Sequence, residues 1–233
     1  MKIAVISDIH GNLEALQAAL MQIDVMEINS VYCLGDIVGY GANPNECIDL
    51  IQARNILSVV GNHDKAAIGE IPVEKFSEAA RLAIEWTQSI LSPFHREFLS
   101  GLPYCRQDHH AMFVHASPDS PEKFRYLFDQ EDTSESFPSF SEPICFVGHT
   151  HRPEIFCEDG TTQIISPNDK FIINVGSVGQ PRDGNWRPCF VTYDTEKFTI
   201  EFIRIEYNAE VPRQKILSAG LPKKLADRLL IGI

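Results

Sequence analysis

Short apolar runs alternate with amphipathic patterns along the chain, and each run ends in a polar cluster. Runs of three to five apolar residues, many of them β-branched, predict buried strands. They lie at Ile3–Ile6, Val31–Leu34, Ile56–Val60, Met112–Val114 and Ile144–Val147. Because helical patterns follow the first two runs, this order indicates parallel pairing and an α/β fold.

Two helices are predicted in the first quarter of the chain. Apolar residues recur at three- and four-residue intervals between Leu13 and Ile23, and Asn12 is placed to cap that helix. The second helix is predicted from Pro44 to Arg54, since proline suits the first helical position. Both helices would lie against the strands that they connect.

Residues 66–103 differ in character, with two helical patterns at Phe76–Leu91 and Pro93–Leu99. We therefore expect a helical insertion between two strands. Residues 117–142 are rich in proline, serine and glutamate, and they predict a surface loop with one helical turn around Phe124–Phe128.

The pattern turns β-rich after residue 160. Strands are predicted at Gln163–Ile165, Phe171–Val175, Phe190–Tyr193 and Thr199–Ile205, followed by a helix that begins near Pro222. The chain shows no internal repeat and no low-complexity linker. We therefore expect residues 1–233 to form a single domain that contains the helical insertion.

Charge and cysteine usage narrow the function classes. The chain has 20 Lys and Arg against 32 Asp and Glu, a net charge of −12. Proteins that bind nucleic acid or anionic membranes without specificity usually carry the opposite sign, so neither partner is expected. The six cysteines lie far apart without a Cys-x-x-Cys pair, and the Ile3–Ile6 run is too short for a secretory signal. These features favour a cytoplasmic protein.

Polar clusters follow all five early strands, at the edge where an α/β sheet forms its ligand crevice. Five of the eight histidines fall in these clusters. Two carboxylates, one amide oxygen and four imidazoles form a mixed oxygen and nitrogen ligand set that suits divalent transition metals. The candidate ligands are Asp8, His10, Asp36, Asn62, His115, His149 and His151.

Seven side chains exceed the need of one ion, because a catalytic site also keeps positions open for water and substrate. A carboxylate that bridges two ions about 3.5–4 Å apart accounts for the whole set and predicts a two-metal hydrolytic site. Two divalent ions would also make the pocket positive, so a phosphate could bind despite the net charge of −12. We expect manganese, with iron, nickel, cobalt or zinc as alternatives.

These clusters resemble the calcineurin-like metallophosphoesterase superfamily, whose pattern is D-x-H, G-D-x, G-N-H-[DE], an isolated H and G-H-x-H, in that order. The resemblance extends from Ser7 to about Asp183. Within the superfamily, the chain is similar to a bacterial and archaeal subgroup with a helical insertion. It implies a four-layer α/β/β/α sandwich. The matching motifs read Asp8-Ile9-His10, Gly35-Asp36, Gly61-Asn62-His63-Asp64, His115 and Gly148-His149-Thr150-His151.

The resemblance also implies a role for each ligand. Asp8, His10 and His151 would hold the first metal, Asp36 would bridge, and the other three candidates would hold the second metal. A hydroxide between the ions would be the nucleophile for in-line attack at phosphorus.

Two further residues in the third cluster are candidate catalytic residues. His63 is not a ligand in this family, and the resemblance implies that it stabilises charge on the phosphoryl oxygens or protonates the leaving alkoxide. Asp64 would orient the His63 imidazole, or it could serve as a helix cap instead.

Other polar residues allow two interpretations each, a role at the site or a role at the surface. Arg152 and Arg182 suit phosphate contacts, but arginine is equally common in surface ion pairs. Tyr40 could stack on a substrate ring or merely cover the rim of the site. Three histidines outside the clusters are expected on the solvated surface, namely His95, His109 and His110.

Three functions follow from these motifs. The first is a metal-dependent phosphatase or phosphodiesterase that acts on a small phosphoester or nucleotide. The second is hydrolysis of a dinucleoside polyphosphate such as diadenosine tetraphosphate, for which the insertion could supply space. The third is a non-catalytic interaction scaffold on the same fold, which predicts missing ligands, and none is missing here. A protein phosphatase is disfavoured, because Gly35–Gly39 lacks the Asp-Arg pair of that class.

Overall fold

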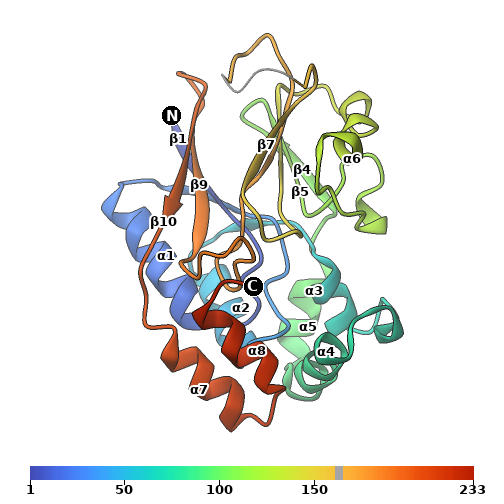
Figure 1. Ribbon diagram of the computed structural model, residues 1–233, viewed down its shortest axis with the longest axis vertical. Coiled ribbons are helices and arrows are strands. Elements are labelled where there is room, and N and C mark those ends of the chain that lie inside the picture. Colours follow the sequence, from blue (N-terminus) through green and yellow to red (C-terminus); the bar gives the residue numbers. More distant parts are fainter. Residues whose placement is uncertain (161–164) are drawn as a thin grey trace.

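The computed structural model describes residues 1–160 and 165–233, and within them two five-stranded sheets pack face to face (Figure 1). The first sheet has the order β10-β9-β1-β2-β3. Strands β1, β2 and β3 are parallel, and the hairpin of β9 and β10 pairs antiparallel to β1. The strands are β1 (Lys2–Ile6), β2 (Ser30–Cys33), β3 (Leu57–Ser58), β9 (Cys189–Asp194) and β10 (Thr199–Arg204).

The second sheet has the order β4-β5-β6-β8-β7. Its three central strands β5, β6 and β8 are parallel, and both edge strands pair antiparallel to their neighbours. The strands are β4 (Cys105–Asp108), β5 (Ala111–Val114), β6 (Ile144–Val147), β7 (Glu154–Cys157) and β8 (Phe171–Asn174). Parallel central strands align their carboxyl ends, which is where the predicted polar clusters begin.

The core between the sheets follows the two-residue period of a strand. In β1, Ile3 and Val5 point into the layer between the sheets, while Ala4 and Ile6 point to the helices outside. From the second sheet, Phe113 and Phe146 fill the same layer. Burial on both faces explains why these strands are continuous apolar runs.

Helices α1 (Leu13–Val25), α2 (Pro44–Ala53) and α5 (Pro93–Ser100) share a buried apolar cluster with the outer face of the first sheet. The predicted cap of α1 is confirmed, because Asn12 Oδ1 accepts a hydrogen bond of 3.2 Å from the Ala15 amide. The outer face of the second sheet is covered by the segment around α6 (Gln130–Ser134). This is the predicted four-layer α/β/β/α sandwich.

A third group of helices lies at the lower end of the molecule in Figure 1. Ala80, Ile216 and Leu225 belong to one buried cluster, so the C-terminal helices close against the insertion. These helices are α3 (Asn62–Ala67), α4 (Glu78–Ile90), α7 (Glu210–Ser218) and α8 (Lys223–Asp227). Short 3-10 helices lie at Val73–Lys75, Pro121–Lys123, Phe137–Ser139 and Arg228–Leu230. None of the helices in the described ranges is long and apolar enough to cross a membrane.

The structure contains elements that the patterns did not predict. Strand β4 is mostly exposed and polar, and β7 is short, so neither has a clear apolar run. Helix α3 overlaps the polar cluster at Asn62, and α7 contains Pro212 in its first turn.

One local prediction is wrong, because Phe124–Phe128 is not a helical turn. Phe124 adopts a left-handed conformation with φ of 50°, which ends the preceding 3-10 helix. The next helix begins only at Gln130. The predicted strand Gln163–Ile165 lies largely outside the described residues.

Candidate metal centre

The seven candidate ligands come together where strands β1, β2, β3, β5 and β6 end. All are buried except Asn62, which is partly buried at the start of α3. Asp8, His10 and His151 form one group, and Asp36, His115 and His149 form another, with Asn62 beside His115. A third group of His10, Asp36 and His63 overlaps both. Residues up to 143 positions apart in sequence therefore converge, as Asp8 and His151 illustrate.

The first group consists of Asp8, His10 and His151. His151 Nε2 lies 3.2 Å from Asp8 Oδ1, and His10 Nε2 lies 3.7 Å from the same oxygen. The two imidazole Nε2 atoms are 3.1 Å apart. Three ligand atoms thus surround one small volume, and all lie within 4.8 Å of one another.

The second group forms around His115. Its Nε2 lies 3.4 Å from Asp36 Oδ2, 3.1 Å from His149 Nδ1 and 3.2 Å from Asn62 Oδ1. Asp36 Oδ2 also lies 3.6 Å from His10 Nε2 in the first group. One carboxylate oxygen therefore stands between the two groups.

Backbone carbonyls fix the orientation of three imidazoles. His10 Nδ1 lies 3.1 Å from Val38 O, His115 Nδ1 lies 2.8 Å from Leu34 O, and His151 Nδ1 lies 2.6 Å from Gln180 O. A carbonyl oxygen only accepts, so each Nδ1 carries a hydrogen and each Nε2 is turned into the site. This is the usual arrangement of a histidine that ligates a metal through Nε2.

The donor set fits divalent cations. Asp8 Oδ2 accepts a 3.0 Å hydrogen bond from the His149 amide, but the buried Asp8 Oδ1 has no hydrogen-bond partner. An anionic oxygen buried in this way is costly unless a cation or donor compensates it. The facing Nε2 atoms of His10 and His151 likewise need a cation or a proton between them.

Electrostatics favours ionised carboxylates at this site. Burial alone would raise the pKa of Asp8, but the imidazoles of His151 and His10 outweigh it and hold that pKa well below its usual value. For Asp36, burial is likewise outweighed by the charges of His115 and His63, which lower its pKa. Both side chains are therefore available as anionic ligands at neutral pH.

The imidazoles divide into two kinds. Burial lowers the pKa of His149 to about 3, and burial together with the charge of Arg182 lowers that of His151 to about 4, so both are neutral ligands at pH 7. Burial opposes the charge of His115 as well, but the Asp36 carboxylate outweighs it and raises the pKa to about 9. A metal ion must therefore displace a proton from His115.

Left-handed backbone turns aim most of these side chains inward. Asp8, His10, Asp36, His149 and His151 have φ between 50° and 68°. This conformation costs roughly 1–2 kcal/mol per residue for an L-amino acid. Strain gathered at one place is typical of functional sites, where the surrounding structure holds it.

Two motif glycines are required by close packing against the ligands. A Cβ at Gly61 would lie 2.1 Å from Asp36 Oδ1. A Cβ at Gly148 would lie 2.1 Å from Ser7 Oγ and 2.5 Å from Asp8 Oδ2. The glycines of these two motifs therefore allow neighbouring loops to approach the carboxylates.

His63 lies beside the ligands. Its backbone amide donates a 2.8 Å hydrogen bond to Asp36 Oδ1. One of its ring nitrogens lies within 4.8 Å of the ligand atoms of His10 and Asp36, so by distance alone His63 could also be a ligand. Its Nδ1 is buried without a hydrogen-bond partner. The Tyr40 and Phe76 rings pack around it, with ring centroids 4.5 and 5.0 Å away.

The expected contact between Asp64 and the His63 imidazole is wrong. Asp64 Oδ1 accepts from the Val38 amide at 3.1 Å, and Oδ2 accepts from the Gly61 amide at 3.0 Å. Asp64 is the third residue of α3, so this is a capping interaction that also ties down the loop after β2. Burial and the charge of Asp36 raise the pKa of Asp64 to about 7.

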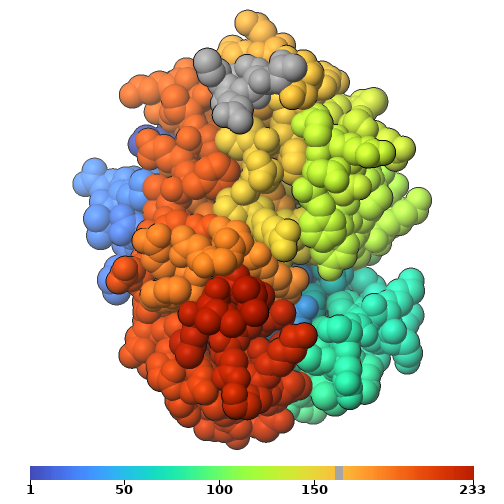
Figure 2. All heavy atoms as spheres, in the orientation of Figure 1, coloured from blue at the N-terminus to red at the C-terminus, as the bar shows by residue number. Residues whose placement is uncertain are grey.

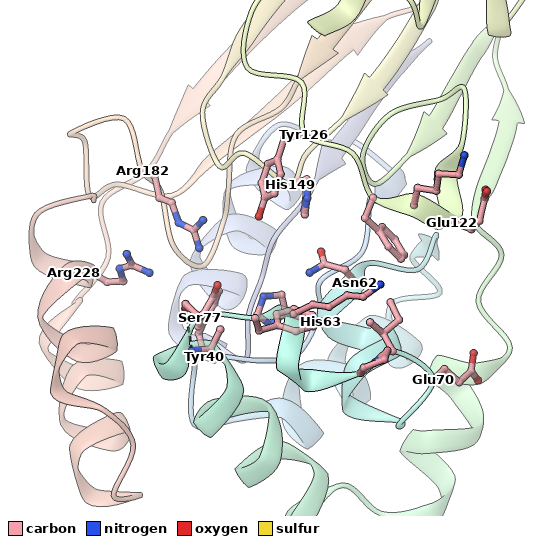
Figure 3. Close-up of a pocket in the computed structure, with 17 residues that line it drawn as sticks. Tyr40, Asn62, His63, Glu70, Ser77, Glu122, Tyr126, His149, Arg182 and Arg228 are labelled. Atoms are coloured by element: carbon pink, nitrogen blue, oxygen red, sulfur yellow. Dashed lines mark hydrogen bonds between the residues drawn. The ribbon is translucent and has the colours of Figure 1, made fainter.

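A cavity of about 810 Å³ opens beside the two groups. Figure 3 shows Tyr126 and His149 facing Asn62, His63 and Tyr40 across it. The Tyr126 ring stacks on the His149 ring at 3.8 Å between centroids. Helix α4 and the segment before it supply one wall, so the predicted insertion borders the site.

The remaining candidates separate clearly. Arg182 lines the cavity, whereas Arg152 does not, and Arg152 Nε instead donates to the Arg182 carbonyl. His95 was expected on the surface but is buried, because it bonds to Asp49 at 2.8 Å and to Asn45 at 2.7 Å. His109 is partly exposed and His110 is exposed, as expected.

Sequence reasoning missed several residues at the cavity, among them Tyr126 and Arg228. Tyr126 lies in the loop expected to be a solvated surface, and its stacking partner is distant in sequence. Arg228 follows the short helix α8, where only the apolar residues Leu225 and Leu229 showed a pattern. No motif marks either residue.

Comparisons with known proteins agree with this geometry. The family model of the calcineurin-like phosphoesterase superfamily domain matches residues 1–197. The chain is 41% identical over 240 residues to an uncharacterised protein of Methanocaldococcus jannaschii, with 99% of this chain and 98% of that protein covered.

Two solved structures share the whole fold. A metallophosphoesterase from Sphaerobacter thermophilus is 38% identical, with a TM-score of 0.88 over 100% of this chain and 99% of that one. A hypothetical protein from Pyrococcus horikoshii OT3 is 24% identical, with a TM-score of 0.84 over 100% and 98% of the two chains.

Proposed function

The chain belongs to the calcineurin-like phosphoesterase superfamily, and from that membership we propose that it is a metal-dependent phosphoesterase that acts on small-molecule phosphomonoesters or phosphodiesters. The observation that carries the proposal is the position of Asp36. Its Oδ2 lies within 3.6 Å of His10 Nε2 and within 3.4 Å of His115 Nε2, between the two ligand groups. A carboxylate in that position suits a pair of ions.

Asp8, His10 and His151 would hold one ion, Asn62, His115 and His149 the other, and Asp36 would contact both. When bound, the ions would neutralise the phosphoryl oxygens and lower the pKa of a water molecule so that it can attack phosphorus. Manganese is the first ion to test. Iron, nickel, cobalt and zinc are the alternatives, because mixed oxygen and nitrogen ligands accept them as well.

The chain's own residues would position the substrate. His63 lies at the cavity wall, so its imidazole could donate to a phosphoryl oxygen or to the leaving alkoxide. Its ring is held in place by Tyr40 and Phe76, which limits its rotation. Asp64 ties the start of α3, where this histidine lies, to the loop after β2 through the amides of Gly61 and Val38.

The cavity supports a small substrate. Its volume of about 810 Å³ is in the range of small-molecule sites. The net charge of −12 argues against long nucleic acids as substrates. A dinucleoside polyphosphate is the second candidate, favoured by the aromatic residues Tyr40, Phe76 and Tyr126 that line the cavity and could stack on a base.

The test is hydrolysis by chelator-treated protein restored with Mn²⁺. The substrates are p-nitrophenyl phosphate, its bis-ester and diadenosine tetraphosphate, and the control variant is Asp36→Asn. Turnover that requires metal and is lost in Asp36→Asn supports the proposal, and the preferred substrate separates the two candidates. Absence of turnover from protein that also fails to retain metal contradicts it and favours a scaffold.

A further inference from the structure

Two arginines converge at one edge of the cavity, beside the metal centre. Arg182 lies in the loop after β8, and Arg228 begins the last 3-10 helix, outside the residues that the family model matches. Arg182 Nη2 donates to Gln180 Oε1 at 2.9 Å, and Arg228 Nη1 donates to the same oxygen at 3.0 Å. Figure 3 shows both side chains on one side of the cavity, opposite Glu70 and Glu122.

No carboxylate neutralises this pair. Among residues 1–160 and 165–233, no acidic side chain lies within ion-pair distance of either guanidinium, although the chain has 32 acidic residues. The Nε atoms of both arginines are buried and have no hydrogen-bond partner. Five of the nine other arginines form ion pairs, namely Arg54, Arg81, Arg125, Arg204 and Arg213.

Like charges gathered on one neutral oxygen repel each other. Burial and the charge of Arg182 both lower the pKa of Arg228, which reports that repulsion. An oxyanion bound to both guanidinium groups would remove the repulsion, because arginine binds phosphate and carboxylate through paired N–H groups. The pair is therefore arranged for an anionic ligand.

The Tyr40 ring packs near Arg182 and near two histidines of the candidate site. Arg182 Cζ lies 5.5 Å from the centroid of the Tyr40 ring. The Tyr40 ring also lies close to the candidate metal centre, since its centroid is 4.5 Å from that of His63 and 4.6 Å from that of His10. Arg182 and the two histidines are therefore neighbours of the same aromatic ring.

We propose that Arg182 and Arg228 form a second oxyanion subsite, which binds a phosphate or carboxylate group that the substrate carries besides its reacting phosphoester. The substrate class is thus a phosphoester with a second anionic group, and one aromatic ring is the first spacer to test. This inference rests on the proposed function. It assigns selectivity to a C-terminal arginine, whereas the metal ligands supply the chemistry.

The test compares three phosphoesters that share one aromatic spacer. Phenyl phosphate has no second anion, 4-carboxyphenyl phosphate has a carboxylate, and 1,4-phenylene bisphosphate has a phosphate. We expect kcat/KM for the bisphosphate to exceed that for phenyl phosphate about tenfold or more, mainly through KM, as for a charge-assisted hydrogen bond. The carboxylate substrate shows which oxyanion the subsite prefers.

Variants assign the preference to the pair. Arg228→Met and Arg182→Met should bring the kcat/KM ratio of bisphosphate to phenyl phosphate close to one, and Arg228→Lys should keep part of it. Arg54→Met is the matched control, because Arg54 pairs with Asp24 on the exposed surface, and it should keep the full ratio. Unfolding temperatures show whether a variant is merely destabilised. If Arg228→Met is destabilised, the kcat/KM ratio of Arg228→Lys decides whether the positive charge produces the preference.

Equilibrium binding separates this inference from the proposed function. Phenylphosphonate and 1,4-phenylenebisphosphonate cannot be hydrolysed, and calorimetry should show tighter binding of the bisphosphonate to the Mn²⁺-loaded protein. Loss of that difference in Arg228→Met supports the subsite even if no ester is hydrolysed. Equal affinity for the two phosphonates, or equal losses on all three esters, would mean that the arginines only hold the C-terminal segment to Gln180.

Discussion

His115 illustrates how one carboxylate sets the chemistry of a ligand. Burial opposes a charge on its ring, but Asp36, 3.4 Å away, outweighs burial and raises the pKa to about 9. Its Nδ1 donates to the Leu34 carbonyl, so the proton that a metal displaces is the one on Nε2.

Metal binding should therefore release a proton. Below pH 9 the His115 imidazole is protonated, so the apparent metal affinity should rise with pH, by up to about tenfold per unit between pH 6 and 8. Calorimetric titration with Mn²⁺ in two buffers of different ionisation enthalpy measures the released protons. His110→Gln, at an exposed histidine, is the control. An affinity independent of pH over this range would contradict the assignment.

His63 should act in turnover rather than in metal retention. It lines the cavity, and it is not one of the seven candidate ligands. We expect His63→Gln to retain bound Mn²⁺ and to lose about 100- to 10,000-fold in kcat, the usual contribution of a general acid. Metal content and steady-state rates on p-nitrophenyl phosphate check both parts. Loss of one ion in this variant would instead make His63 a ligand.

The loops after the strands, rather than the strands themselves, carry the strain of the site. Gly148 lies between β6 and the ligand His149, and its missing side chain makes room for Ser7 and Asp8. The close approach lets the His149 amide donate to Asp8 Oδ2 at 3.0 Å. The two sheets are thereby joined at the metal centre.

Substitution of this glycine should disturb stability and the site together. A Cβ in Gly148→Ala would lie 2.1 Å from Ser7 Oγ, so we expect a loss of about 1–3 kcal/mol in the free energy of unfolding and weaker metal binding. Gly101→Ala is the control, because its Cβ would have no atom nearer than 3.6 Å. Urea denaturation of both variants measures the difference. Equal stabilities would show that the loops relax freely.

Strands buried on both faces could be predicted from sequence, and exposed ones could not. Ile144–Val147 is predicted with the bounds that the structure gives, because all four residues are buried. Strand Cys105–Asp108 is an edge strand with mostly exposed polar side chains, so no apolar period marks it. Helix α7 is only weakly amphipathic and contains Pro212, so the sequence pattern did not predict it either.

The site was predictable where side chains carry the chemistry. The seven candidate ligands stand in motifs after strands, and the structure brings them together. The carbonyls of Val38, Leu34 and Gln180 orient three histidines, but a backbone carbonyl has no sequence signature. Arg228 depends on how the C-terminal helices pack, which no local pattern specifies.

At the scale of the whole molecule, the proposed function assigns chemistry and substrate selectivity to different parts of the chain. All seven candidate ligands lie in the region that the family model matches, residues 1–197. Part of the cavity wall comes from the insertion and from Arg228 in the C-terminal segment. Figure 2 shows the C-terminal residues in red and the insertion in teal next to each other on one face of the molecule. Changes in these two segments should alter substrate preference more than metal binding.

The number of Mn²⁺ ions bound per chain tests the central claim most directly, by titration with equilibrium dialysis. We predict two ions for the wild-type protein, one retained ion for Asp8→Asn, and weaker binding of both ions for Asp36→Asn, since Asp36 Oδ2 lies between the two groups. One ion in the wild type, or the same stoichiometry for Asp8→Asn and Asp36→Asn as for the wild type, would contradict a bridged two-metal centre.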